Sequence, residues 1–137
     1  MITVMFACVH NAGRSQMAAA FFNQLADPAK ARGLSAGTQP GERVHPEVLA
    51  TMRELGIDLD GVKPQRLTAK MVAECRWLIT MGCGDECPIA PFFVQKRDWP
   101  LEDPKGRPVA QVREIREDVR TRVVAFIAEN GWGREPA

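Results

Sequence analysis

The chain of 137 residues carries 18 Lys and Arg against 17 Asp and Glu, a formal net charge of +1, and 45% of its residues are hydrophobic. This length and balance predict one globular domain over residues 1–137 and argue against a disordered chain. The lack of a basic excess argues against a nucleic-acid-binding domain. No apolar run approaches the ~20 residues that span a bilayer, and the short apolar N-terminus has no basic leader, so we expect a cytoplasmic protein without membrane contact.

The first 26 residues predict a strand, a tight loop and a helix. Ile2–Ala7 is a continuous apolar stretch with β-branched residues, which is typical of a buried strand. From Arg14 onward alanine is frequent and apolar side chains recur every four residues, which indicates a helix with one buried face. These apolar side chains are Met17, Phe21 and Leu25.

Strands and helices alternate along the rest of the chain. In order, the sequence predicts a strand over Leu34–Ala36, a helix from His45-Pro46 to Gly56, a short helix over Thr68–Ala73, strands over Trp77–Met81 and Phe92–Val94, and a last helix that stops at Asn130-Gly131. This alternation indicates a three-layer α/β fold with a parallel sheet. In such sheets ligands bind beyond the carboxyl ends of the strands.

The loop after the first predicted strand separates Cys8 from Arg14 by five residues. A loop of this length between strand and helix turns its backbone N–H groups inward and makes an anion nest, to which the helix N-terminus adds free donors. Arg14 is able to grip two oxygens of a tetrahedral oxyanion at once. The same positive field favours the thiolate form of Cys8, and Ser15 is placed to hydrogen-bond its sulfur.

The simpler interpretation of this loop is a buried cysteine that ends a strand and a surface arginine that starts a helix. The position after a buried strand, where Gly13 and Arg14 open a helix, favours the anion site instead. Asn11 tolerates a left-handed backbone, and we assign His10 no catalytic role. The predicted oxyanion-binding residues are Val9, His10, Asn11, Ala12, Gly13, Arg14 and Ser15.

Cys83 and Cys87 lie four residues apart in a glycine-rich and acidic segment after the third predicted strand. A zinc site would need four ligands, and the two histidines show no matching spacing. An inert core role fits poorly with a polar segment. We favour a thiol relay, in which Cys83 or Cys87 attacks an intermediate on Cys8 and the disulfide passes outward. Cys75, beside apolar residues at the entry to a strand, is predicted to be a buried structural residue.

An acidic segment precedes the last helix and offers a general acid. Asp103, held before Pro104, is the predicted proton donor to a leaving oxygen, with Asp98 and Glu102 as the alternatives. The competing interpretation is a solvated turn, because Asp-Pro often initiates turns.

Together these segments resemble the arsenate reductases built on the low-molecular-weight tyrosine phosphatase fold. The resemblance covers nearly the whole chain and rests on the segments CVHNAGRSQMA, SAGTQP, VHPEVLATMRELGIDL, TMGCGDECP and WPLEDP. The first segment is shared with the phosphatases, whereas TMGCGDECP favours the reductases. The resemblance implies a four-stranded parallel sheet with helices on both faces. We predict no cofactor or metal.

The resemblance also implies a reaction that belongs to arsenic detoxification. Cys8 would attack arsenate at arsenic while Arg14 and the loop amides hold its oxygens, with phosphate or sulfate as mimics. Asp103 would protonate the departing water. A second thiol would then attack Cys8, release arsenite and leave a disulfide.

Cys83 and Cys87 match the relay thiols of the thioredoxin-coupled members of this group. In those enzymes the first relay cysteine directly follows the strand, whereas Gly82 occupies that place here, so the order of attack stays open. Related members use a low-molecular-weight thiol with a mycoredoxin-like partner. We therefore expect either thioredoxin or a mycoredoxin-like reductant as the partner of a monomeric enzyme.

Two other functions fit the same loop. A phosphomonoester hydrolase of the tyrosine phosphatase type would use the same nucleophile, but the chain has no Tyr and its extra thiols have no role in hydrolysis. A redox-sensing module would have Cys8 oxidised by peroxide and trapped by Cys83.

Overall fold

The computed structural model describes residues 1–82 and 89–134. In chain order its elements are β1 (Ile2–Cys8), α1 (Arg14–Leu25), β2 (Ala31–Gly37), α2 (Pro46–Arg53), α3 (Ala69–Ala73), β3 (Trp77–Thr80), β4 (Gln95–Asp98) and α4 (Val109–Asn130). The predicted α/β alternation is confirmed. Within the described ranges, no helix is both long enough and apolar enough to cross a membrane.

The four strands form one parallel sheet in the order β2-β1-β3-β4. The chain therefore leaves β1 to one side for β2 and returns to its other side for β3. Open α/β sheets bind ligands where the strand order switches in this way, outside the carboxyl ends of the strands. That point is the end of β1, where Cys8 pairs with Gly37 of β2 and Ala7 pairs with Thr80 of β3.

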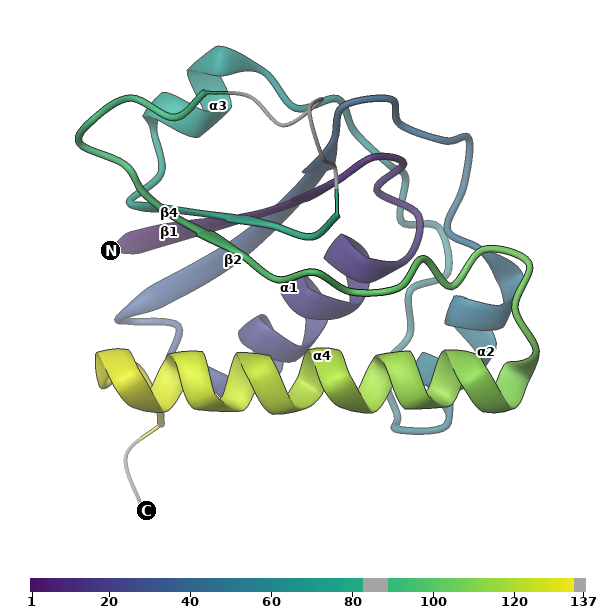
Figure 1. Ribbon diagram of the computed structural model, residues 1–137. Helices are drawn as coiled ribbons and strands as arrows, with labels where there is room; N and C mark the ends of the chain where they lie inside the picture. The colour runs from purple at the N-terminus through teal and green to yellow at the C-terminus, as the bar shows by residue number, and fades with distance from the viewer. Residues whose placement is uncertain (83–88, 135–137) are drawn as a thin grey trace.

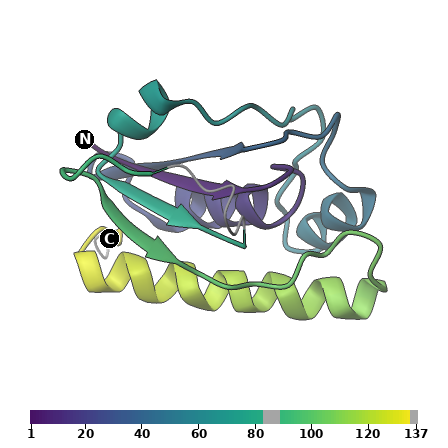
Figure 2. The ribbon, with the colours of Figure 1, turned by 45° about the horizontal axis from the view of Figure 1, so that its top comes forward.

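Helices cover both faces of the sheet, as Figures 1 and 2 show. Side chains alternate along β1, so that Val4 and Phe6 join the core beneath α1, α2 and α4, whereas Met5 and Ala7 join a smaller core with Val72 of α3. Because β1 is buried on both sides, its sequence is continuously apolar. The predicted three-layer α/β/α architecture is thus confirmed.

The predicted helix ends agree with the structure at two positions. Thr68 is the N-cap of α3, and its hydroxyl accepts a hydrogen bond from the amide of Met71 at 3.2 Å. Gly131 caps α4 in the left-handed conformation with φ 71°, which a residue with a side chain seldom adopts. The Asn130-Gly131 stop signal is therefore confirmed.

The predicted fourth strand at Phe92–Val94 is wrong. Residues 92–94 form a turn, and β4 begins at Gln95. Among the strands of residues 1–82 and 89–134, β4 lies at the edge of the sheet and pairs only with β3, and most of its residues are exposed. Since nothing requires an edge strand of this kind to be apolar, its sequence QKRD carries no strand signal, whereas the apolar run before it does.

Candidate active site

Cys8 ends β1 with its side chain buried at the switch point, 2% exposed. Its Sγ lies 2.9 Å from Oγ of Ser15, at the start of α1. Asn11 donates from Nδ2 to the same hydroxyl oxygen at 2.8 Å. Because that oxygen accepts from Asn11, the Ser15 proton is free to point at the sulfur and to hydrogen-bond it. The structure thus brings Cys8, Asn11 and Ser15 together as the sequence predicts.

The backbone carbonyls of the loop all face away from its centre. Those of residues 8, 9, 10 and 12 accept hydrogen bonds of 2.8–3.2 Å from amides of residues 38–45. The Asn11 carbonyl accepts from Nε2 of Gln16 at 3.0 Å. Each peptide N–H points opposite to the preceding C=O, and among the described residues none accepts a bond from the amides of residues 10–13. These amides are therefore available to an anion in the loop.

Asn11 holds the loop in shape. It has φ 51°, the left-handed region that Asn tolerates better than most residues. Its Oδ1 accepts from the Gln65 amide at 3.0 Å and from Nε2 of Gln16 at 3.1 Å. Sequence reasoning missed Gln16 and Gln65, because both act through Asn11 and one comes from a segment 54 residues away.

Arg14 is buried, 6% exposed, and its guanidinium contacts the segment that precedes α4. Its Nη1 donates to the backbone carbonyl of Leu101 at 3.0 Å, and its Nη2 lies 3.8 Å from Oδ2 of Asp103. A side chain fixed in this way loses little conformational freedom when it binds an oxyanion. The arrangement makes Arg14 a preorganised partner for the loop amides.

Among the three acids that the sequence offered, only Asp103 lies against Arg14. Asp98 belongs to β4, where its Oδ1 accepts from the Thr80 hydroxyl at 2.7 Å. Glu102 binds Nε2 of Gln111 at 2.7 Å, on the side of α4. Asp103 is half-exposed and close to the charge that would hold a substrate. The geometry therefore favours Asp103 as the acid over the two alternatives.

The residue before α1, Gly13, is packed between the segment that carries Asp103 and the start of α2. Pro104 packs against Gly13 so closely that a Cβ atom on Gly13 would lie 2.7 Å from Cγ of Pro104. His45 lies beside the same glycine, and its amide donates to the Ala12 carbonyl at 2.9 Å. Burial lowers the pKa of His45, although the Asp103 carboxylate opposes that shift. His45 thus lies near the site, whereas the sequence suggests only that it starts a helix.

Gly82, two residues after β3, lies directly against the guanidinium of Arg14. Its φ is 89°, and a Cβ atom there would collide with Nη1 of Arg14. We predict that Gly82→Ala displaces the guanidinium and weakens the binding of a tetrahedral oxyanion such as phosphate by about tenfold, the effect of losing one good contact. Calorimetric titration with phosphate measures this change in affinity.

The matched control is Gly61→Ala. Gly61 has a similar φ of 79°, but a Cβ atom there would meet nothing within 4 Å. This variant carries the backbone strain without the collision, and its anion affinity should equal that of the wild type. Equal weakening in both variants would show that strain, rather than the contact with Arg14, is responsible.

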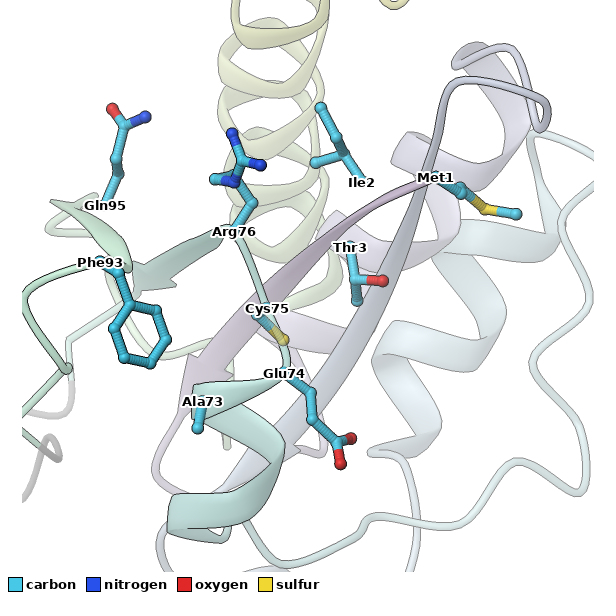
Figure 3. Close-up of a pocket in the computed structure, with 9 residues that line it drawn as sticks. All are labelled: Met1, Ile2, Thr3, Ala73, Glu74, Cys75, Arg76, Phe93 and Gln95. Atoms are coloured by element: carbon cyan, nitrogen blue, oxygen red, sulfur yellow. The ribbon is translucent and has the colours of Figure 1, made fainter.

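Cys75 lies far from this loop, at the amino ends of the strands. It lines a hollow of about 500 Å³ with residues that precede or begin β1, β3 and β4 (Figure 3). Its Sγ donates to the Met71 carbonyl at 3.0 Å, and burial raises the pKa of its thiol. The predicted structural role of Cys75 agrees with this burial.

Cys83 and Cys87 lie outside the described residues, so their relay role stays a prediction. Across residues 1–82 and 89–134, no three His, Cys, Asp or Glu side chains gather in a way that could hold a metal ion.

Comparison with known proteins identifies the family of the whole chain. Residues 3–130 match the family model of the low molecular weight phosphotyrosine protein phosphatases. The chain belongs to this family. A putative arsenate reductase of Halobacterium salinarum is 40% identical over 90% of this chain and 89% of its own length. A glutaredoxin arsenate reductase of Synechocystis sp. is 36% identical over 94% of this chain and 98% of its own.

Solved structures agree with this placement. The thioredoxin-dependent arsenate reductase of Corynebacterium glutamicum superposes with a TM-score of 0.80 at 35% identity, and the match covers 94% of this chain and 61% of that longer chain. The low molecular weight protein tyrosine phosphatase of T. tengcongensis superposes with a TM-score of 0.79 at 20% identity, over 94% and 99% of the two chains. At that identity the phosphatase shows the shared fold alone.

Proposed function

We propose that this protein reduces arsenate to arsenite, with Cys8 as the nucleophile. One observation carries the proposal: the Cys8 sulfur lies at the base of a loop whose amides and Arg14 are free to hold a tetrahedral oxyanion. Relatives between 35% and 40% identical are named arsenate reductases. A phosphatase is not favoured, because the phosphatase compared above is only 20% identical.

The first step forms a bond between the Cys8 sulfur and arsenic. Arsenate gives up one oxygen, which takes up protons and leaves as water, and arsenic remains As(V). Asp103 supplies a proton to that oxygen, and it lies beside Arg14, the side chain that holds the substrate. Arg14 and the loop amides hold the other oxygens and stabilise their charge in the transition state.

The second step is the redox step. A second thiolate attacks the Cys8 sulfur, a disulfide forms, and the sulfur–arsenic bond breaks with both electrons going to arsenic. Arsenic leaves as As(III) in arsenite, and two thiols become one disulfide. A third thiol then attacks the attacking thiol's sulfur in this disulfide, which frees Cys8 and leaves a disulfide between the second and third thiols. We assign the second and third thiols to Cys83 and Cys87, in either order.

An external dithiol then reduces the disulfide between Cys83 and Cys87 and becomes a disulfide itself. A thioredoxin-type protein is the proposed reductant, supported by the thioredoxin dependence of the solved relative. A mycoredoxin-like reductant working with a small thiol is the alternative. We place the proposed enzyme in the cytoplasm, because its relay needs the reducing conditions that keep thiols free. We further propose that it acts as a monomer and without a cofactor.

Arsenite release with thioredoxin, thioredoxin reductase and NADPH tests this proposal directly. We expect turnover in the wild type and none in Cys83→Ser or Cys87→Ser. Retained turnover of Cys83→Ser with a small thiol would point to the low-molecular-weight-thiol route. Absence of arsenite with every thiol donor, together with brisk hydrolysis of an aryl phosphate, would show a phosphatase.

Asp103→Asn tests the acid. The amide cannot give up a proton, so kcat for arsenite formation should fall by about 10²- to 10⁴-fold, the usual contribution of a general acid. Glu102→Gln, next to it in the chain but bonded toward α4, is the matched control and should keep its kcat. Equal kcat values for Asp103→Asn and the wild type would assign the proton to another group.

A further inference from the structure

The loop that leads into β4 displays an unusual group of apolar side chains to solvent. Phe92 is 100% exposed, Ile89 is 95% exposed and Phe93 is 53% exposed. The rings of Phe92 and Phe93 stack edge to face with centroids 5.5 Å apart. Large apolar side chains gathered in this way on a surface mark an interaction site more often than chance exposure. We call Ile89, Pro91, Phe92 and Phe93 the β4 apolar patch.

The β4 apolar patch continues into two hollows. Ile89 and Pro91 line one of about 280 Å³, whose far wall is Leu67 and the α3 residues Ala69 and Val72. Phe93 lines the hollow of about 500 Å³ at the amino ends of the strands, where Figure 3 shows its ring on the side of α3. An exposed aromatic side chain beside a concave, largely apolar hollow is the pattern of a protein interface.

The β4 apolar patch lies close in sequence to Cys87, one of the two proposed relay thiols. Only Pro88 separates Cys87 from Ile89 in the sequence, so covalent geometry alone keeps the Cα atoms of Cys87 and Ile89 within roughly 7 Å of each other. A protein that exchanges a disulfide with Cys87 must bring its own sulfur to bonding distance of the Cys87 sulfur. A partner of protein size therefore covers the neighbouring surface, which begins at Ile89. A small thiol covers none of it.

We propose that the β4 apolar patch is the docking surface for the reductant, a small dithiol protein of the thioredoxin type with an apolar rim around its attacking cysteine. This assignment rests on the proposed function. On docking, the partner's thiolate attacks the disulfide that the relay leaves, its second thiol releases the mixed disulfide, and the partner departs oxidised. Phe92, which is fully exposed in the free protein, supplies the anchor that is buried in the complex.

Phe92→Ser tests the proposal, because a fully exposed side chain contributes little to the folded state. We expect KM for reduced thioredoxin to rise by about tenfold, as for the loss of an interface anchor, while KM for arsenate stays at its wild-type value. Turnover driven by dithiothreitol should not change. Phe92→Leu, which keeps an apolar side chain, should restore most of the thioredoxin affinity.

The matched control is Val124→Ser, which removes an apolar side chain 48% exposed on α4, the helix on the other face of the sheet (Figure 1). Its KM for thioredoxin should equal that of the wild type. An unchanged KM in Phe92→Ser, or wild-type reduction by dithiothreitol but not by thioredoxin, would overturn the docking surface and leave arsenate reduction intact. Failure of the wild type to form arsenite even with dithiothreitol would overturn the proposed function itself.

Discussion

Replacing Cys8 with serine should abolish arsenite formation, with a loss of at least about 10⁴-fold in kcat/KM, as for other removed nucleophiles. A serine hydroxyl is almost fully protonated at neutral pH, and it cannot form the disulfide that releases arsenite. The loop amides and Arg14 are unchanged in this variant, so its affinity for phosphate should persist. Arsenite assays and phosphate calorimetry measure the two properties separately.

Cys75→Ala is the matched control for the loss of a thiol. Cys75 is buried at the amino ends of the strands, away from the loop, and burial raises the pKa of its thiol. This variant should reduce arsenate at the wild-type rate, even where its stability is lower. Full activity of Cys8→Ser would make the assignment of the nucleophile wrong.

Arg14→Lys should lower kcat/KM for arsenate by about 10²- to 10³-fold, the cost of one transition-state donor at such sites. Lysine keeps the positive charge but presents a single ammonium group. It cannot hold the Leu101 carbonyl and two arsenate oxygens at the same time. The buried Leu101 carbonyl then competes with the substrate for the remaining donors.

Arg53→Lys is the control for this conservative exchange. Arg53 is exposed at the end of α2, where it pairs with Asp60 at 3.0 Å. Ion pairs of this exposed kind contribute little, so kcat/KM should be unchanged. A wild-type value for Arg14→Lys would mean that the site needs only a charge, and the bidentate grip would be refuted.

The sequence predicted the strand–loop–helix unit around Cys8 because each part carries a local signal. An apolar run, a loop with Gly13, and an alanine-rich helix follow one another within 26 residues. Parallel sheets also restrict where a ligand binds, so the position of the loop followed from the fold class. The sequence favours Asp103 over Asp98 and Glu102 only through the Asp-Pro pair, and the contact with Arg14 supports that prediction.

Long-range contacts and the polar edge strand escaped prediction. The carbonyl of Leu101 holds Arg14 across 87 residues of chain, and no local pattern encodes such a bond. The apolar residues of Phe92–Val94 predict a strand by their residue types alone. In the structure Phe92 is fully exposed and the strand begins at Gln95, so a run of apolar residues did not mean burial here.

A single-turnover experiment tests the central claim, that arsenate is reduced by thiols of the chain itself. The fully reduced protein, with its four thiols, is mixed with excess arsenate and no other reductant. We predict that each chain releases one arsenite and loses two titratable thiols, and that Cys8→Ser does neither. Four remaining thiols and no arsenite from the wild type would contradict the account.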